Sequence, residues 1–277
     1  MLCTNFVSPI QLRRDAPLTI YARALITGAT SGIGAAFARE LPARTSLLLT
    51  GRDRRRLAEM RESLSGPGRE VTVIEADLAE PADRDRLAAR AEAFAVDLLI
   101  NNAGAAAFGP VLENGAAAER TTAEVNAVAV VDLTARLLPG MIERAGRRRR
   151  AGLINVSSAL AFQPTPFLAT YAASKAFILM YSQALSAELR HEPVDVLTLC
   201  PGATRTAFGR RAGFGPGNLP GADDPAVVAR HALRALGRRP VHVMGPISRS
   251  LLRPGLTAQY LATQTLGIVM RAVGRAL

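Results

Sequence analysis

The sequence predicts an α/β fold: a doubly wound parallel sheet of about seven strands with helices on both faces. Short runs of Leu, Val and Ile recur along the chain, and segments with helical periodicity separate them. No repeat or low-complexity linker divides the 277 residues, a length that is ordinary for a single sheet domain. Alternating strand and helix signals imply parallel strands joined by right-handed crossovers.

The expected strands and helices follow one another in strict alternation. The apolar runs that read as buried strands are residues 24–27, 47–50, 71–74, 98–101, 153–156, 194–199 and 241–244. The stretches that read as helices are residues 34–41, 54–65, 81–94, 117–144, 170–190 and 225–236. A Gly- and Pro-rich loop at residues 206–224 has no clear period, and we expect it to cover a substrate site.

The two ends of the chain differ from its middle. Residues 1–20 lack the apolar core of a signal peptide and read as a flexible extension before a single domain at 21–277. Residues 247–277 read as a helical, basic tail. No uninterrupted apolar run approaches the ~18–20 residues of a membrane span, and the nearest, 162–189, is broken by polar residues. With only Cys3 and Cys200 as cysteines, the chain is expected in a reducing, cytoplasmic location.

The formal charge of +11 raises the question of an anionic partner. Of the 34 basic residues, only Lys175 is a lysine, which indicates a compositional preference for arginine across the surface. The densest run, Arg147 to Arg150, lies between a predicted helix and a predicted strand, where a solvated helix end is expected. The charge is therefore not taken as a sign of nucleic-acid binding.

A glycine pattern lies where the first strand turns into the first helix. Its spacing is G-x-x-x-G-x-G. Such a turn needs backbone angles that glycine accepts readily, and the missing side chains let a pyrophosphate approach the main chain. The helix N-terminus adds free N–H groups and a favourable dipole. The pattern predicts a dinucleotide site formed by Gly28, Thr30, Ser31, Gly32, Ile33 and Gly34.

The end of the second strand indicates which dinucleotide binds. An acid at this point holds the ribose 2′-hydroxyl of NAD, whereas an arginine accommodates the 2′-phosphate of NADP. The uncharged Thr50 and Gly51 precede Arg52, whose guanidinium matches a phosphate in charge and geometry. We therefore expect NADPH or NADP as the cofactor. Asp53 would hold a ribose if the register shifted by one residue, so NAD stays an alternative.

The single lysine, Lys175, follows Tyr171 by four residues in a predicted helix, so the two side chains share a face. Tyrosine has a reference pKa of ~10, and a nearby cation favours the phenolate and lowers that pKa. Because arginine replaces lysine everywhere else, this placement indicates a functional pair. Ser158 ends the fifth strand thirteen residues before Tyr171, and its hydroxyl is placed to donate to a substrate oxygen.

Together these motifs resemble the short-chain dehydrogenase/reductase family, in its NADP-preferring type, over residues 22–243. The resemblance implies a Rossmann-like sheet with a nicotinamide dinucleotide across its carboxyl edge. In the family, the position of Asp77 contacts adenine and that of Thr206 holds the nicotinamide carboxamide. The further cofactor contacts that the resemblance implies are Leu78, Asn101, Ala103, Gly104, Pro201, Gly202 and Thr204. Thr204 stands where the family more often has Val or Ile.

The resemblance also implies a catalytic set of Asn126, Ser158, Tyr171 and Lys175. Ser158 orients a carbonyl and Tyr171 donates a proton to it. Lys175 anchors the nicotinamide ribose and tunes Tyr171, and both residues contact the cofactor. Asn126 takes the family's structural and proton-relay role. The expected reaction is NADPH-dependent reduction of a ketone or aldehyde to an alcohol, with no metal.

The substrate and the assembly are only outlined by the sequence. Phe162, Phe167, Phe208 and Phe214 would line a pocket for an apolar, lipid- or steroid-like substrate, although ordinary packing explains them as well. Family members usually pair through the helices matching 117–144 and 170–190, so we expect a homodimer or homotetramer.

Three alternatives stay open. In the first alternative, the protein is an NAD-linked alcohol dehydrogenase of the same family. In the second, it is a scaffold or sensor that binds NADPH without turnover. In the third, it is a lipid-surface protein whose basic tail makes peripheral membrane contact. This third alternative is compatible with catalysis.

Overall fold

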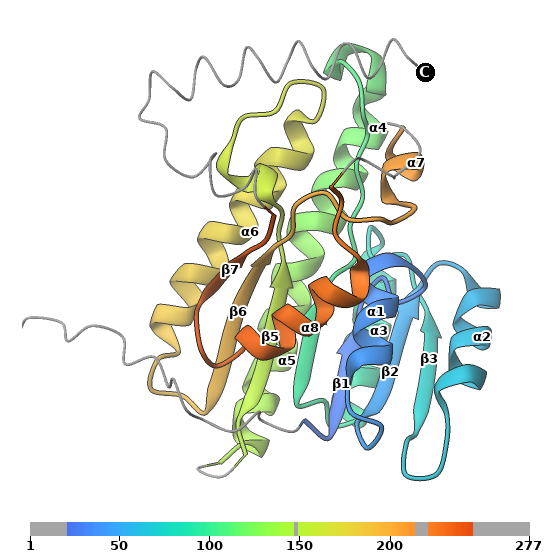
Figure 1. Cartoon of the computed structure of the whole chain (residues 1–277), viewed down its shortest axis with the longest axis vertical. Helices are drawn as coiled ribbons and strands as arrows, with labels where there is room; N and C mark the ends of the chain where they lie inside the picture. The colour runs from blue at the N-terminus through green and yellow to red at the C-terminus, as the bar shows by residue number, and fades with distance from the viewer. Residues whose placement is uncertain (1–20, 147–148, 214–220, 246–277) are drawn as a thin grey trace, which may run out of the picture.

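The computed structural model describes residues 21–146, 149–213 and 221–245. Its strands pair in parallel as one sheet in the order β3-β2-β1-β4-β5-β6-β7 (Figure 1). The strands are β1 (Arg23–Ile26), β2 (Ser46–Gly51), β3 (Val71–Glu75), β4 (Leu98–Asn101), β5 (Ala151–Val156), β6 (Val194–Cys200) and β7 (Val241–Val243). The predicted Rossmann-like sheet is confirmed, with bounds close to those predicted.

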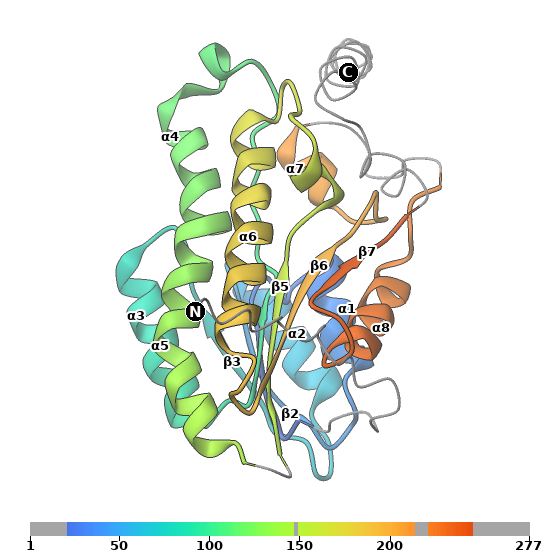
Figure 2. The same ribbon diagram turned by 90° about the vertical axis from the view of Figure 1, so that its left-hand side faces the viewer.

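Helices cover both faces of the sheet, as Figure 2 shows from the side. One face carries α1 (Gly32–Glu40), α2 (Arg54–Leu64) and α8 (Pro225–Ala235). The other carries α3 (Pro81–Ala93), α5 (Ala129–Arg144) and α6 (Ala169–Glu188). Because the strand order reverses between β1 and β4, the connections after these two strands leave toward opposite sides and open a crevice at the carboxyl edge.

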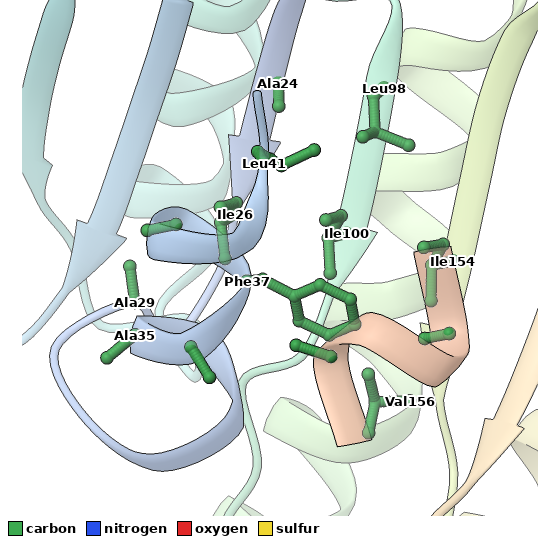
Figure 3. Packing of buried hydrophobic residues seen from close by; sticks show 14 of the residues in the cluster. Ala24, Ile26, Ala29, Ala35, Phe37, Leu41, Leu98, Ile100, Ile154 and Val156 are labelled. Carbon is green, nitrogen blue, oxygen red and sulfur yellow. The ribbon is translucent and has the colours of Figure 1, made fainter. Parts of the chain in front are cut away.

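The core beneath α1 centres on Phe37, whose side chain is fully buried. Figure 3 shows its ring lying among Ile100, Ile154 and Val156 of the central strands. Small alanines on α1, including Ala35, let the helix approach the sheet closely. Burial of one such aromatic side chain contributes about 1.5–3 kcal/mol, so this packing fixes the helix that begins at the glycine loop.

The helix predicted at 117–144 is longer and less regular than predicted. Helix α4 (Val111–Ala123) begins earlier and contains Gly115 with φ of 76°. It runs through a π-helical turn, η1 (Glu124–Val128), into α5. The span Val111–Arg144 is long and apolar enough to cross a membrane, whereas the sequence pointed to 162–189. Half of its apolar window is buried, and residues such as Leu133 pack on the sheet, which accounts for the composition.

The predicted substrate loop at 206–224 contains a short helix, α7 (Phe208–Ala212), which ends at Gly213 with φ of 86°. In Figure 1, α7 lies beyond the carboxyl ends of the central strands. Glycines within and after α7 hid it from periodicity arguments. Residues 214–220, the predicted extension 1–20 and the predicted tail 247–277 lie outside the described residues.

One arginine of the run at 147–150 is not the solvated side chain that we predicted. The Nε of Arg150 donates to Asp195 Oδ1 at 2.8 Å, and its guanidinium also donates to the carbonyls of Glu192 and Val194. Arg150 therefore fastens the start of β5 to the start of β6.

Candidate active site

The glycine loop after β1 is built around close backbone approach. Gly28 and Gly32 have φ of 63° and 55°, angles that glycine adopts without strain. A Cβ on Gly34 would lie 2.3 Å from the carbonyl oxygen of Gly28, so a side chain there would break the turn. Ser31 is the N-cap of α1, yet its side chain makes no capping hydrogen bond. The helix N–H groups therefore stay available to an anion, and the loop fits a pyrophosphate.

Other predicted residues of this loop have distinct positions. The side chain of Thr30 lies against the end of β2, where a Cβ on Gly51 would be 2.9 Å from its methyl group. The side chain of Ile33 packs into the core under α1, which leaves its backbone N–H for a ligand. The methyl of Thr206 lies 2.8 Å from where a Cβ on Gly32 would be, so the segment after β6 stands directly over the glycine loop.

The loops after β1 and β4 are joined by hydrogen bonds. The hydroxyl of Thr27 accepts from the backbone N–H of Asn102 at 2.9 Å and from that of Ala103 at 3.0 Å. The Nδ2 of Asn102 donates to the carbonyls of Thr27 and Gly28. Ala103 and Gly104 therefore follow directly on a turn that is fixed beside the glycine loop.

The side chain of Asn101 faces the interior and not the predicted cofactor. It is buried, and its Nδ2 donates to Thr134 Oγ1 at 3.1 Å and to Asn155 Oδ1 at 2.9 Å. Asn155 in turn donates to Ser182. Alternation along a strand sends neighbouring side chains to opposite faces, which is why Asn101 braces the helices while Asn102 braces the loop.

Arg52 and Asp53, which follow β2, make different contacts. The side chain of Arg52 is two-thirds exposed and pairs with Asp77 at 3.6 Å. Asp53 is the N-cap of α2: its Oδ1 accepts from the backbone N–H of Arg56 at 3.0 Å, and its Oδ2 pairs with the Arg56 guanidinium at 3.3 Å. The carboxylate considered for a ribose is therefore already engaged in the helix cap.

The predicted adenine edge lies after β3. Asp77 accepts from the backbone N–H of Ala79 at 3.0 Å, and a cleft of about 360 Å³ lies beside it. Its lining residues are Arg52, Glu75, Ala76, Asp77, Asp83 and Arg86. Leu78 is buried, so its side chain anchors the turn. Arg84, which the sequence did not single out, donates to the carbonyl of Leu78 at 2.8 Å and pairs with Asp132 of α5, which fixes this turn.

Ser158, Tyr171 and Lys175 converge above the carboxyl ends of β5 and β6. The Ser158 hydroxyl lies near enough to that of Tyr171 for a side-chain hydrogen bond that favours the phenolate. The Nζ of Lys175 lies 5.7 Å from the centre of the Tyr171 ring and donates to the carbonyl of Val156 at 2.9 Å. Ser158 also accepts from Leu160 N–H and caps η2 (Ala159–Phe162), so its rotamer is fixed. The neighbouring Ser157 donates to the carbonyl of Lys175 at 2.7 Å, which is a structural role.

The protonation of this trio differs from the prediction. Burial raises the pKa of Tyr171 to about 12, and the Ser158 hydrogen bond offsets this only in part. Burial also lowers the pKa of Lys175 to about 8. The prediction that Lys175 lowers the tyrosine pKa is wrong for the protein without a ligand, because the desolvation of the phenolate dominates and the ammonium is held by Val156. Tyr171 is thus a protonated phenol at neutral pH.

Asn126 lies in the π-helical turn η1 and is fully buried. Its Oδ1 accepts from Ala105 N–H at 2.9 Å, and its Nδ2 donates to the Ala105 carbonyl at 2.8 Å and to Ser174 at 3.0 Å. Each polar atom of the side chain has a partner, so the geometry supports the structural half of the predicted role. The same contacts place Gly104 beside Lys175 Nζ, which is 3.8 Å from where a Cβ on that glycine would be.

The segment after β6 forms the far wall of the site. The carbonyl of Pro201 accepts from Ala159 N–H, and the hydroxyl of Thr204 donates to the Gly202 carbonyl. The hydroxyl of Thr206 accepts from Phe208 N–H at 3.2 Å, which starts α7. These bonds hold the predicted residues at the crevice although the loop has no regular period.

Helix α7 brings two further residues to the site: Phe208, which the sequence offered for the substrate pocket, and Arg211, which it did not assign there. The ring of Phe208 lies 5.5 Å from that of Tyr171, centre to centre. The guanidinium of Arg211 donates to the Ser31 hydroxyl at 3.0 Å, although the two residues are 180 positions apart. No local pattern reports a contact over such a separation, which is why Arg211 and Arg84 were missed.

The four phenylalanines considered for a substrate pocket separate in the structure. Phe208 lies at Tyr171, and Phe167 packs on Phe108 with ring centres 6.0 Å apart. Phe162 instead packs with Leu179 and the buried Cys200, so for this residue ordinary packing is the correct interpretation. Phe214 lies outside the described residues.

A parallel sheet with a glycine loop at its switch point, next to a joined Ser, Tyr and Lys, defines a dinucleotide-binding oxidoreductase. A model of the family described as short chain dehydrogenase matches residues 22–213. The chain therefore belongs to the short-chain dehydrogenase family, whose typical cofactor is NAD or NADP.

Relatives and solved structures agree with this assignment. Dehydrogenase/reductase SDR family member 7B of Bos taurus is 31% identical over 257 residues, covering 86% of this chain and 78% of the relative. Very-long-chain 3-oxoacyl-CoA reductase of Anas platyrhynchos is 34% identical over 187 residues, covering 65% of this chain but only 59% of the relative. A short-chain dehydrogenase from Sphingobium yanoikuyae, solved with NADPH, superposes with a TM-score of 0.73 at 30% identity, covering 90% and 94% of the two chains.

Proposed function

We propose that this protein is an NADPH-dependent reductase that converts an apolar ketone or aldehyde to an alcohol. One observation carries the proposal: the Ser158 hydroxyl lies within hydrogen-bonding reach of that of Tyr171, and Lys175 lies on the same helix face beside the tyrosine. Two hydroxyls that meet at one point form a donor pair for a carbonyl oxygen, and the protonated state of Tyr171 suits donation of a proton to it.

The chain's own residues supply orientation and the proton. Ser158, fixed by its bond from Leu160 N–H, directs a hydroxyl toward the substrate oxygen. Tyr171 transfers its phenolic proton to the alkoxide oxygen that develops, a step worth about 10²–10⁴-fold in rate. Lys175 provides positive charge beside the resulting phenolate. The bound dinucleotide supplies the hydride, and its positioning provides much of the remaining acceleration.

Two features of the structure and one similar protein support NADPH over NADH. Arg52 is exposed at the end of β2, where the 2′-position of the adenosine ribose is expected. Asp53, the acid considered for a ribose hydroxyl, caps α2 and pairs with Arg56. The similar Sphingobium yanoikuyae enzyme was solved with NADPH.

An apolar substrate is supported by the surroundings of Tyr171. Phe208 lies beside the tyrosine, and the neighbouring rings of Phe108 and Phe167 are tied to the same segment, since Phe108 N–H donates to the Ala212 carbonyl at 2.9 Å. Two relatives are named as a 3-oxoacyl-CoA reductase and a ketoacyl reductase, the latter the HetN protein of Nostoc at 26% identity. Fatty acyl ketones are therefore the first substrates to examine.

The test is a comparison of wild type with Tyr171→Phe and Arg52→Ala, using nicotinamide fluorescence for binding and NADPH oxidation for turnover. We expect Tyr171→Phe to bind NADPH as the wild type does and to lose turnover by at least about 10²-fold. We expect Arg52→Ala to lose the preference for NADPH. Retained turnover in Tyr171→Phe would sink the catalytic assignment. Binding of NADPH without turnover on any acyl or steroid ketone would favour the scaffold alternative.

The assembly and location remain proposals as well. Apolar side chains on the α4–α6 side are exposed, namely Val111, Leu112, Val128, Phe177 and Met180, and they support pairing of two copies through this side. Sedimentation should give a homodimer or homotetramer, and Met180→Glu should yield monomers; a monomeric wild type would contradict this. We place the protein in the cytoplasm, and co-sedimentation with liposomes tests the alternative of peripheral membrane contact.

A further inference from the structure

Three arginines from separate parts of the chain gather at one end of the glycine loop. Arg52 follows β2, Arg56 lies in the first turn of α2, and Arg211 comes from α7, far along the sequence. The Arg211 guanidinium reaches the Ser31 hydroxyl at 3.0 Å. Its pKa is lowered by burial and then by the positive charges of Arg52 and Arg56, which indicates that the three groups lie within electrostatic reach of one another.

Two of these three arginines are paired with a carboxylate, and Arg211 is not. Arg52 pairs with Asp77, and Arg56 pairs with Asp53. Among the described residues, Arg211 has no carboxylate partner, and the hydroxyl of Ser31 is neutral. Mutual repulsion of arginines is unfavourable unless an anion joins them, and a guanidinium fork is well suited to a phosphate monoester.

We propose that Arg211 is a third arginine ligand of the 2′-phosphate of NADPH, closing over it from α7 while Arg52 and Arg56 hold it from the β2 side. The inference rests on the proposed preference for NADPH and adds a residue from the substrate-covering segment to that site. Ser31 orients the Arg211 side chain toward the loop, because its hydroxyl accepts from Arg211 and makes no cap bond to its own helix.

The arrangement has a consequence for the catalytic end of the site. Helix α7 carries Phe208 three residues before Arg211, and Phe208 lies on Tyr171. One short helix therefore contacts both the glycine loop, through Arg211, and the catalytic Tyr171, through Phe208. A phosphate held by Arg211 fixes the same helix that covers the tyrosine.

The experiment measures binding of adenosine 2′,5′-bisphosphate and adenosine 5′-monophosphate to the full chain by calorimetry. We expect Arg211→Ala to weaken the bisphosphate by about tenfold and to leave the monophosphate unchanged, since one charge-assisted bond to phosphate is lost. Arg210→Ala is the matched control: it removes an exposed arginine side chain of the same helix for which no hydrogen bond or ion pair is seen within the described residues, and it should change neither affinity. Arg211→Lys, which keeps the charge without the fork, should fall between.

Equal weakening of both nucleotides by Arg211→Ala, or of neither, would overturn the inference. Thermal melting of Arg211→Gln, which keeps a donor for Ser31, separates loss of charge from loss of fold. A wild type that binds both nucleotides equally would overturn the proposed NADPH preference together with this inference. A wild type that discriminates, while Arg211→Ala discriminates equally well, would overturn this inference alone.

Discussion

Two parts of the site differ in how their charged groups are solvated: the floor, which we define as Tyr171 and Lys175, and the rim, which we define as Arg52, Arg56 and Arg211. On the floor, Lys175 is buried and its pKa falls to about 8, while Tyr171 remains a neutral phenol. On the rim, the side chains of Arg52, Arg56 and Arg211 are exposed. A lysine can change its protonation on burial, whereas arginine stays charged. The difference explains why a chain that otherwise uses only arginine keeps one lysine at the floor.

The largest expected effect comes from removing that lysine. Lys175→Met should lower turnover by about 10²–10⁴-fold because the phenolate loses its neighbouring cation. The same change should raise the free energy of unfolding at pH 7 by roughly 1–3 kcal/mol, since a desolvated ammonium is no longer required and only the bond to Val156 is lost. Chemical denaturation and steady-state kinetics on the same variant measure both. A Lys175→Met variant that is less stable than the wild type would contradict the inference that burying the Lys175 ammonium destabilises the fold.

The next effect concerns the loop between floor and rim. Gly34→Ala should weaken NADPH and NADH alike, by about 100-fold, because the new Cβ would meet the Gly28 carbonyl at 2.3 Å and displace the loop. Gly66→Ala is the matched control, since a Cβ there meets nothing within 4 Å. Fluorescence titration of both cofactors measures the change. Loss of NADPH binding alone would show that the loop discriminates cofactors, a property assigned to the rim.

A pH series sharpens the comparison further. Between pH 8 and 10.5, an unfolded chain keeps the proton on Lys175 that the folded chain has released, so the contribution of this lysine to stability rises with pH. Between pH 10 and 12, the unfolded chain loses the Tyr171 proton first, so stability falls. Relative to wild type, Lys175→Met should flatten the rise and Tyr171→Phe the fall. Unchanged slopes in these variants would place the titrating groups elsewhere.

The smallest effect is expected at the apolar cover. Phe208→Ala should raise KM for a long-chain 3-oxoacyl substrate by about 5- to 30-fold, by removing apolar contact worth about 1–2 kcal/mol at Tyr171. Phe162→Ala serves as the control, because Phe162 packs with Leu179 in the core and should affect stability but not KM. Equal effects of the two substitutions on KM would remove Phe208 from the substrate site.

Local patterns were enough to predict the sheet and the motif positions but not the long-range contacts. The strands are continuous apolar runs, and the motifs stand at their ends, so their positions follow from the chain itself. The π-helical turn around Asn126 and helix α7 were missed, since both depend on contacts with distant segments. The high pKa of Tyr171 was also missed, because sequence spacing reports a nearby cation but not the burial that outweighs it.

The bonds of Thr27 and Asn102 join segments that are 75 residues apart in the chain. Strands β1 to β3 lie within the first third of the described chain, but β1 also pairs with β4, and the glycine loop is completed by the turn after β4. A nascent chain that ends before β4 therefore has the glycine sequence without its finished shape. Long-range pairing in parallel sheets forms late, so the chain should bind the nucleotide only after both halves of the sheet have paired. Binding should then stabilise the folded chain.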